Sequence, residues 1–414
     1  MKTEPGKGTA TVIRQKYLGE KGSIGLIVLL SAFVPLSTDL YLPALPGMVD
    51  YFGVPVMLVN LTLILFFIFF SAGMLFWGPL SDKYGRKPIL LTGLIIYIAA
   101  SVGCAFSWDI WHLILFRALQ AAGGSAASAV ATAMVKDLYT GRKQESVLAI
   151  VQSMVVISPA VAPVLGAFML PYTSWQGLFW MLSLIGIVSL GGGILLEEPL
   201  TNRYTGTMMR SFGRLGTVLK NPGFTSLLIV FSLVSTASLA FITDSSYIFV
   251  NQFGLSEQWY SFYFAVIAIG MISGPFIYLR ISRYIRRNTI IVSCFAIMSV
   301  SGVMISLFGG LGPVAFTLTL FPASLIGSCV RPSGTFLMLQ QQKEDTGSAA
   351  SLINCFGLIF GSAGMVLVSL GGENLVLSIG IINTVIGLAC LSGFMLIRKL
   401  HLAKEVPDIV GTGK

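Results

Sequence analysis

The sequence predicts an all-α membrane protein with twelve transmembrane helices in two six-helix halves. Of its 414 residues, 55% are apolar and only 10% are charged, whereas a soluble domain has about 25% charged residues. Long apolar segments recur along the chain, and the basic residues between them fall in alternate loops. Composition, segment length and charge placement therefore indicate the same class.

Apolar runs of about 18 residues or more can cross a bilayer as helices, and charged or Pro/Gly-rich breaks separate twelve of them. In the first half we expect helices over 23–47, 57–79, 89–107, 110–135, 146–170 and 177–196. In the second half we expect helices over 223–248, 259–280, 289–309, 312–340, 348–370 and 375–398. The resulting units are a tail (1–22), a bundle (23–196), a linker (197–222), a second bundle (223–398) and a tail (399–414).

Lysine and arginine orient these helices. Two of the 26, Arg117 and Arg331, fall well inside spans, and the others lie at span ends, in the two tails or in every second loop. Because cytoplasmic loops are enriched in these residues, we expect a multi-pass protein of the cell inner (cytoplasmic) membrane with both termini in the cytoplasm. The same one-sided placement makes the lipid bilayer, and not nucleic acid, the expected partner of a chain with net charge +9.

The two halves repeat faintly. FWGPLSDKYGRKP, at the end of the second span, and MISGPFIYLRISRYIRRN, at the end of the eighth, each place Gly-Pro before a basic loop. Two six-helix halves related by an axis along the membrane normal are a plan of transporters, with the substrate site near the midplane between them. The repeat therefore favours a transporter over a membrane receptor or sensor.

The string GPLSDKYGRKP (78–88) is the most specific in the chain. Gly78 and Gly85 allow a tight backbone, and Asp82 and Arg86 lie one helical turn apart. An acid at a helix end beside basic residues can form a charge relay that another helix end joins. A simple anchor on the cytoplasmic side would explain the lysines of this loop but not the Gly/Asp/Gly/Arg spacing, so we expect a conformational motif.

STDLYLPALP (37–46) places a carboxylate, Asp39, about sixteen residues into the first apolar span. Pro43 cannot donate a hydrogen bond to residue 39, which leaves a carbonyl beside the carboxylate free for water, a proton carrier or a ligand. Because burial disfavours the charged form of a carboxylate, Asp39 is the first candidate for the coupling proton. The alternative is a fixed ion pair with Arg117, although a pair that breaks on protonation would itself be a switch.

Three further charges lie within spans. Arg117 is about seven residues into the fourth span, where an arginine costs on the order of 3 kcal/mol. It should face a cavity or a partner, with Gln120 on the same helical face, unless it reaches back to the outer interface. Asp244 lies in the outer half of the seventh span and Arg331 in the inner half of the tenth, so we do not expect them to pair.

These charges and two tyrosines supply the candidate site. The proton-coupling candidates are Asp39, Arg117 and Asp244. The substrate-cavity candidates are Tyr41, Gln120, Tyr247 and Arg331.

ISPAVAPVLGAFM (157–169) carries two prolines and a run of small residues in the fifth span. Pro159 and Pro163 each free a carbonyl one turn earlier and permit a bend. Gly166 belongs to a small-residue stripe suited to close helix contact. We count these three residues with the conformational motif, while the stripe alone fits simple packing equally well.

Together these strings resemble a known family. The 78–88 string is similar to the loop 2–3 signature of the major facilitator superfamily. LILFRALQAAGGSAA (113–127) resembles the Arg-x-x-Gln-Gly-x-Gly pattern of its twelve-span drug/proton antiporter branch, with Ala121 in place of the first glycine. The fifth span resembles the antiporter signature of that branch, with Ala162 and Ala167 in place of glycines. TDLYLPALP and the paired prolines are most similar to the bicyclomycin-resistance (Bcr/CflA) type.

The resemblance implies the major facilitator fold and proton-coupled multidrug efflux by alternating access, a route to antibiotic resistance. Protons would be the coupling ion, with no other cofactor, and the substrates would be small lipophilic drugs or metabolites carried by a monomer. Protonation of Asp39 would favour one state and substrate the other. The alternative is a dedicated exporter of a single metabolite or metallophore on the same fold, which the polar chemistry of Asp244 and Arg331 would favour.

An ATP-driven pump and an enzyme are not expected. The sequence has no G-x-x-x-x-G-K-[ST] phosphate loop. Its two histidines, His112 and His401, lie near span ends, and its five cysteines lie in apolar spans without the spacing of metal ligands. We therefore expect no metal site.

Overall fold

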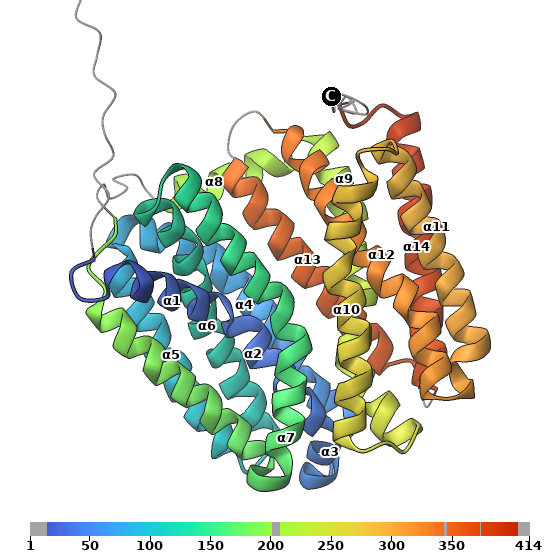
Figure 1. Ribbon diagram of the computed structural model, residues 1–414, viewed down its shortest axis with the longest axis horizontal. Coiled ribbons are helices and arrows are strands. Elements are labelled where there is room, and N and C mark those ends of the chain that lie inside the picture. Colours follow the sequence, from blue (N-terminus) through green and yellow to red (C-terminus); the bar gives the residue numbers. More distant parts are fainter. Residues whose placement is uncertain (1–14, 201–207, 343–345, 373, 405–414) are drawn as a thin grey trace, which may run out of the picture.

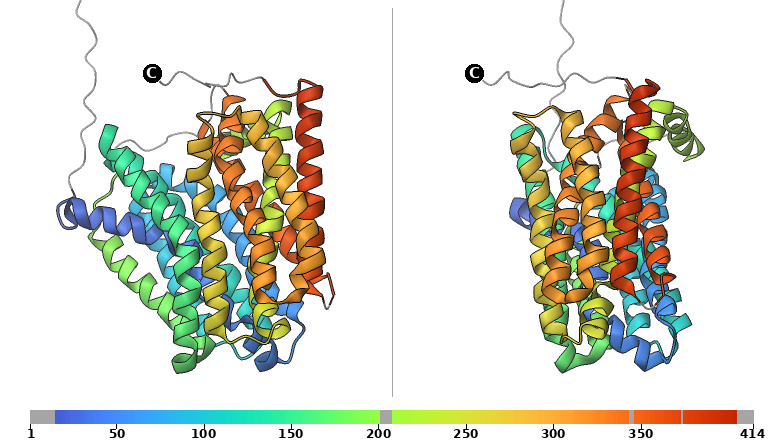
Figure 2. Two further views of the ribbon diagram at one scale, coloured as in Figure 1. Left: turned by 45° about the vertical axis from the view of Figure 1, so that its right-hand side comes forward. Right: turned by 90° about the vertical axis from the view of Figure 1, so that its right-hand side faces the viewer.

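The computed structural model describes residues 15–200, 208–342, 346–372 and 374–404, and these contain helices and no strand. Eleven of the helical segments in these ranges are long and apolar enough to cross a membrane. One lies in α7 (Gly141–Leu195), whose backbone is non-helical at Ser174 (φ 57°, ψ 179°). Figures 1 and 2 show α7 turning back on itself at one end of the molecule. Counted as two at that turn, the described spans number twelve, and the predicted all-α membrane class is confirmed.

The first half forms one bundle (Figure 1). Its first span is assembled from α1 (Gly19–Ser31), α2 (Phe33–Asp39), the 3₁₀ turn η1 (Leu42–Ala44) and α3 (Leu45–Phe52). The other helices of this half are α4 (Val56–Tyr84), α5 (Arg86–Ala105), α6 (Ile110–Leu138) and α7.

The second half forms a bundle beside the first (Figure 1). Its helices are α9 (Pro222–Ser246), extended by the π-helix η2 (Tyr247–Gln252), α10 (Glu257–Ile281), α11 (Arg287–Phe308), extended by η3 (Gly309–Leu311), α12 (Pro313–Gln340), α13 (Thr346–Ser369) and α14 (Leu375–Lys399). A helix not expected from the sequence, α8 (Met208–Leu219), lies in the linker.

The first span is broken twice, where a single helix over 23–47 was expected. Pro35 has no N–H for the carbonyl of Ser31, and helix α1 ends at Ser31. In the same way Pro43 has no N–H for the carbonyl of Asp39, and α2 ends at Asp39. The two missing hydrogen bonds account for both breaks.

Two helix pairs form the seam between the bundles, α4 against α13 and α7 against α10. The larger apolar core crosses this seam at one end, where the N-terminal half meets residues such as Phe241, Phe249 and Phe264. At the other end of the C-terminal bundle a separate core surrounds Phe231 and Phe295. The bundles are therefore packed together at one end of the seam only.

The positive-inside asymmetry predicts which end of the molecule faces which compartment. Lys220, beside α8, and Asn374, before α14, are both exposed. We expect Lys220→Cys to react with an impermeant thiol reagent from the cytoplasmic side and Asn374→Cys from the outside, in a background without the native cysteines. Labelling of both from one side would contradict the twelve-span topology.

Candidate functional site

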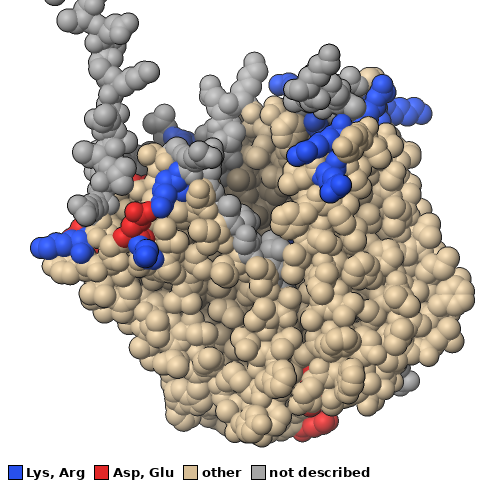
Figure 3. Space-filling model, viewed as in Figure 1, with Lys and Arg blue, Asp and Glu red and all other residues tan. Residues whose placement is uncertain are grey.

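A cavity of about 560 Å³ opens into the seam at the end that carries the basic loops (Figure 3). Helices α4 and α6 line one wall and α13 the other, and Arg214 and Leu215 of α8 lie at the mouth. Gly78, Asp82 and Arg86 of the predicted conformational motif line its rim. The structure is thus open toward the side of the molecule where the basic residues gather.

The opposite end of the seam is sealed by direct contacts. The Ser261 hydroxyl of α10 donates to the carbonyl of Pro163 in α7 at 3.1 Å. The Asn60 amide of α4 donates to the Asp244 carboxylate of α9 at 2.8 Å. The large shared core lies around these contacts. Only one end of the seam therefore admits water.

Asp39 is buried, with 5% of its surface exposed, at the point where α2 ends. Its Oδ1 accepts a hydrogen bond from Thr38 Oγ1 at 3.0 Å, but this hydroxyl lies equally close to the Val34 carbonyl. Asp39 forms no ion pair with any residue that the structure describes. On the other side of the seam, Tyr260 lies within electrostatic reach of the carboxylate. Asp39 is thus a buried acid without a cationic partner.

Gly166 explains how α7 approaches this carboxylate. A Cβ at Gly166 would collide with the carbonyl oxygen of Leu40, the residue after Asp39. Only glycine allows the helix this close to the broken end of α2. Pro163 continues the helix and offers its carbonyl across the seam to Ser261, whereas the side chain of Pro159 lies outside the described residues.

Arg117 is fully buried inside the N-terminal bundle. Its Nη1 donates to the Ser37 carbonyl at 2.9 Å and to Gln120 Oε1 at 2.6 Å. The guanidinium lies 4.5 Å from the centre of the Tyr41 ring and 4.3 Å from that of Phe66, as in cation–π contacts.

Three sequence hypotheses about intramembrane charges are resolved by these contacts. Arg117 does not reach the outer interface, and it does not pair with Asp39. Asp244 is fully buried and bonded to Asn60, whereas Arg331 is exposed on α12, so those two do not pair either.

Of the four substrate-cavity candidates, three are buried and one is exposed. Tyr41, Gln120 and Tyr247 are buried beyond the closed end of the open cavity, and none of the three lines it. Tyr41 shares a 2.7 Å hydrogen bond with Thr62, and Gln120 donates to Ser101 at 2.8 Å. Arg331 stands apart from this cluster.

Arg86 organises the conformational motif. It is 6% exposed, and it contacts Asp82 at 2.5 Å, Ser81 at 2.6 Å and Asp137 at 2.7 Å. Asp137 comes from the end of α6, so the arginine joins the ends of two spans. Spacing predicted the Asp82 contact, but Asp137 lies 51 residues away and nothing in the motif pointed to it.

Glu198, just after α7, is a second residue that the sequence did not single out. Its carboxylate accepts hydrogen bonds from the backbone N–H groups of Arg86 at 2.8 Å and Lys87 at 3.1 Å, which are otherwise unsatisfied at the start of α5. Gly85 has φ 108°, and a Cβ there would strike this carboxylate. Nothing in the sequence separates Glu198 from the other acids of the basic loops, such as Asp82 and Glu197.

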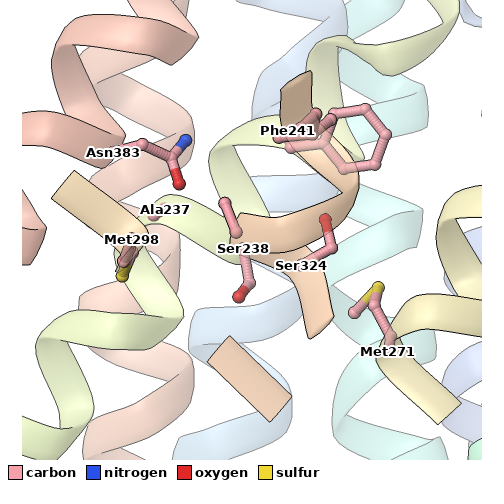
Figure 4. Close-up of a pocket in the computed structure, with 9 residues that line it drawn as sticks. Ala237, Ser238, Phe241, Met271, Met298, Ser324 and Asn383 are labelled. Atoms are coloured by element: carbon pink, nitrogen blue, oxygen red, sulfur yellow. The ribbon is translucent and has the colours of Figure 1, made fainter. Parts of the chain in front are cut away.

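A second cavity, inside the C-terminal half, is too small for an organic molecule. It is lined by residues of α9, α10, α11, α12 and α14, with Ser238, Ser324 and Asn383 as its polar groups (Figure 4). Its volume of about 10 Å³ holds one water at most. Of these two cavities, only the one in the seam has room for a small organic molecule.

Comparison with known proteins agrees with this architecture. The model of the Major Facilitator Superfamily matches residues 27–365. The chain is 27% identical over 344 residues to the uncharacterized MFS-type transporter YdgK of Bacillus subtilis (strain 168), which covers 81% of this chain and 86% of the relative. It is 25% identical over 347 residues to a bicyclomycin resistance protein homolog of Haemophilus influenzae, with the same coverage.

A solved structure of low sequence identity shares the fold. The bacterial homolog of the human lysosomal transporter Spinster, in an inward-facing and occupied conformation, superposes with a TM-score of 0.71 at 13% identity over 93% of this chain and 98% of that one. The resemblance that the motifs suggested is confirmed.

Glu198 offers a test of how loop 2–3 is held. Glu198→Ala removes the acceptor for two N–H groups at the start of α5, so we expect a loss of about 1 kcal/mol of stability, seen as a lower Tm in detergent. Glu197→Ala is the matched control, because Glu197 uses only its backbone, toward Gln15. Equal Tm values for the two variants would contradict the capping role.

Proposed function

Because the chain belongs to the Major Facilitator Superfamily, we propose that it is a proton-coupled exporter of small lipophilic drugs that works by alternating access. In this proposal it lies in the cytoplasmic membrane with both termini inside, and it acts as a monomer. The likeness to the bicyclomycin resistance homolog supports the substrate class. The observation that carries the coupling is Asp39, an acid buried beside the seam without a cationic partner among the described residues.

The surroundings of Asp39 suit a carboxylate that gains and loses a proton. In a low-dielectric site the charged form is stabilised only by hydrogen bonds or nearby cations. Asp39 has one shared hydroxyl and no cation, so in the sealed state it should hold a proton. When the seam opens beside Asp39, water can accept that proton. The carboxylate therefore exchanges its proton with whichever side of the membrane the seam is open to.

The open cavity supplies the other half of the cycle. Drug would enter it from the cytoplasm, between α4 and α13, and would reach the apolar cluster around Phe66 and Phe70 at its closed end. Closure of this end would bring α13 toward the rim formed by Asp82 and Arg86. Drug and proton would then be exchanged by rocking the two bundles about the seam.

Export of a single acidic metabolite is the second candidate, and Arg117 favours it. The guanidinium is fully buried, and its Nε and Nη2 have no hydrogen-bond partner among the described residues. An acidic or carbonyl group of the cargo could satisfy these donors if the aromatic rings over them moved aside. The two candidates differ in breadth of substrate.

The proposal predicts what Asp39→Asn does. In an efflux-deficient host, the wild-type protein should raise resistance to several unrelated lipophilic drugs, and an uncoupler should abolish the effect. Asparagine keeps the size of the side chain but cannot release a proton, so Asp39→Asn should remove this resistance. Drug binding in detergent should persist and become nearly independent of pH between 5 and 9.

The matched control is Asp50→Asn, which makes the same change at an exposed carboxylate of α3. It should behave as wild type. Resistance to no drug in the panel would shift the case to the single-metabolite exporter. Wild-type drug-dependent proton release by purified Asp39→Asn would show that another group carries the proton.

Asp82→Asn tests the loop. Asp82 lines the cavity rim and contacts Arg86, whereas the proposed drug site around Phe66 and Phe70 lies at the closed end of the cavity. We expect the transport rate to fall while the Kd for drug stays within about twofold, because the change biases the two states and touches no ligand. Lys83→Gln, one residue further along, is the control. Loss of binding with a normal transport rate would contradict a gating role.

A further inference from the structure

One amide side chain joins the two halves at the sealed end of the seam. Asn60 Nδ2 donates to Asp244 Oδ1 at 2.8 Å and to Ser369 Oγ at 2.7 Å. Asn60 lies in the outermost turns of α4, whereas Asp244 and Ser369 lie near the outer ends of α9 and α13. Asn60 and Asp244 are fully buried. We call these three residues the outer bridge.

The outer bridge is the main compensation for the Asp244 charge. No described Lys, Arg or His forms an ion pair with Asp244. The titratable groups in electrostatic reach are Tyr247, on η2, and through it Tyr41 of the first span. Both tyrosines are neutral hydroxyls and add no positive charge.

Other helices packed on α9 offer no cation at this depth. The Tyr260 hydroxyl of α10 bonds to Ser245. The cations on the described parts of these helices are Arg210 and Arg214 on α8, Arg280 on α10, Arg331 on α12, and Arg398 and Lys399 on α14, and all lie toward the basic end. Glu257, at the outer start of α10, is an acid and adds no positive charge. The Asn60 amide is therefore the group that stabilises an ionised Asp244.

We infer that Asn60 is a positioning residue through which ionised Asp244 holds the outer end of the seam closed. A hydrogen bond to a charged acceptor is roughly twice as strong as one to a neutral acceptor. The inference rests on the proposed function in one respect, namely that the protein alternates between a state closed at the outer end of the seam and a state open there.

The bridge is poised to open because it is incompletely satisfied. Asn60 Oδ1 and Asp244 Oδ2 are buried and have no partner among the described residues. An unsatisfied buried acceptor destabilises the closed seam, and this cost disappears when the seam opens and water can donate a hydrogen bond to the acceptor. Closure therefore depends on the strength of the Nδ2 bond, and protonation of Asp244 weakens that bond.

This arrangement would prevent wasteful cycling. A carrier that holds neither proton nor drug would keep its outer end closed and wait, open to the cytoplasm, for a drug. A proton arriving from outside would neutralise Asp244 and so weaken the bridge. An antiporter needs this bias, because an empty carrier that returned outward would let protons in without exporting drug.

The test measures access from outside through a single cysteine. Leu63 is fully buried one turn deeper on α4 than Asn60, and Leu63→Cys in a background with the five native cysteines replaced is the reporter. Cells are treated with an impermeant thiol reagent at external pH 5.5 to 8.5 without any drug. Labelling of exposed Asn374→Cys corrects for the intrinsic pH dependence of the thiol.

The parent reporter should label slowly at pH 8.5 and faster at pH 5.5. Adding Asn60→Ala or Asp244→Asn should raise labelling at pH 8.5 by about tenfold and flatten the profile, since the charge-assisted bond is gone. Thr62→Val is the matched control, because Thr62 is also buried on α4 but bonds Tyr41 within its own half. It should keep the parent profile.

The exchanged pair Asn60→Asp with Asp244→Asn restores an amide–carboxylate bond across the seam with its ends reversed. It should return slow labelling and pH dependence, which neither single variant shows. A parent-like profile in Asn60→Ala, or equal effects of Asn60→Ala and Thr62→Val, would overturn the inference. If Asn60→Ala fails to fold, Asp244→Asn and the exchanged pair still decide it.

The readout also separates this inference from the proposed function. Labelling is measured without a substrate. Asp39→Asn should keep the pH dependence that the bridge produces, although its overall level shifts because Asp39 also biases the two states, and it should abolish drug resistance. A missing drug phenotype with an intact pH-dependent profile would refute drug export and leave the bridge standing. A flat profile in the parent, together with normal drug export, would refute the bridge and leave the proposed drug export standing.

Discussion

A charge in the low-dielectric interior of a membrane protein must be paired, hydrogen-bonded or neutralised by a proton. In this protein the contacts that stabilise the buried charges differ from one charge to the next. Arg117 is held by a carbonyl, an amide and two aromatic faces, all neutral. Asp244 has one amide from the opposite half. Asp39 has a shared hydroxyl. The two acids are thus left where gain of a proton is the available way to remove the charge.

The placement of these acids along the seam connects their chemistry to movement. The basic end contains solvated, compensated charges, with Arg86 held between two carboxylates beside an open cavity. The other end is apolar and is crossed by a few polar contacts. Water screens the field of a charge at the wet end, whereas at the dry end that screening is absent and the field of a single charge reaches further. Control of the dry end by protonation follows from this difference.

Backbone constraints bring the bundles and the carboxylates into position. Prolines remove two hydrogen bonds from the first span and leave it broken beside Asp39. Gly166 admits the broken end against α7, and Gly85 admits the Glu198 carboxylate against the start of α5. In each case a residue without a donor or without a side chain permits an approach that another residue would prevent.

Composition, apolar period and charge placement were enough to predict the helical membrane class, the spans and the local contacts of Asp82 with Arg86 and of Arg117 with Gln120, because each depends on neighbours one helical turn apart. The break beside Asp39 was also predictable, since a proline acts on the residue four places before it. The partners of the buried charges were not: Asn60 and Asp244 are 184 residues apart, and Arg86 and Asp137 are 51 apart. Asp39 and Arg117 were expected as a possible pair because both are charged and buried, yet the rotation of their helices directs the arginine to Ser37 and Gln120. Sequence determines which charges enter the membrane, but only the packing of helices decides which groups face them, because facing depends on the rotation and depth of elements that are distant in the chain.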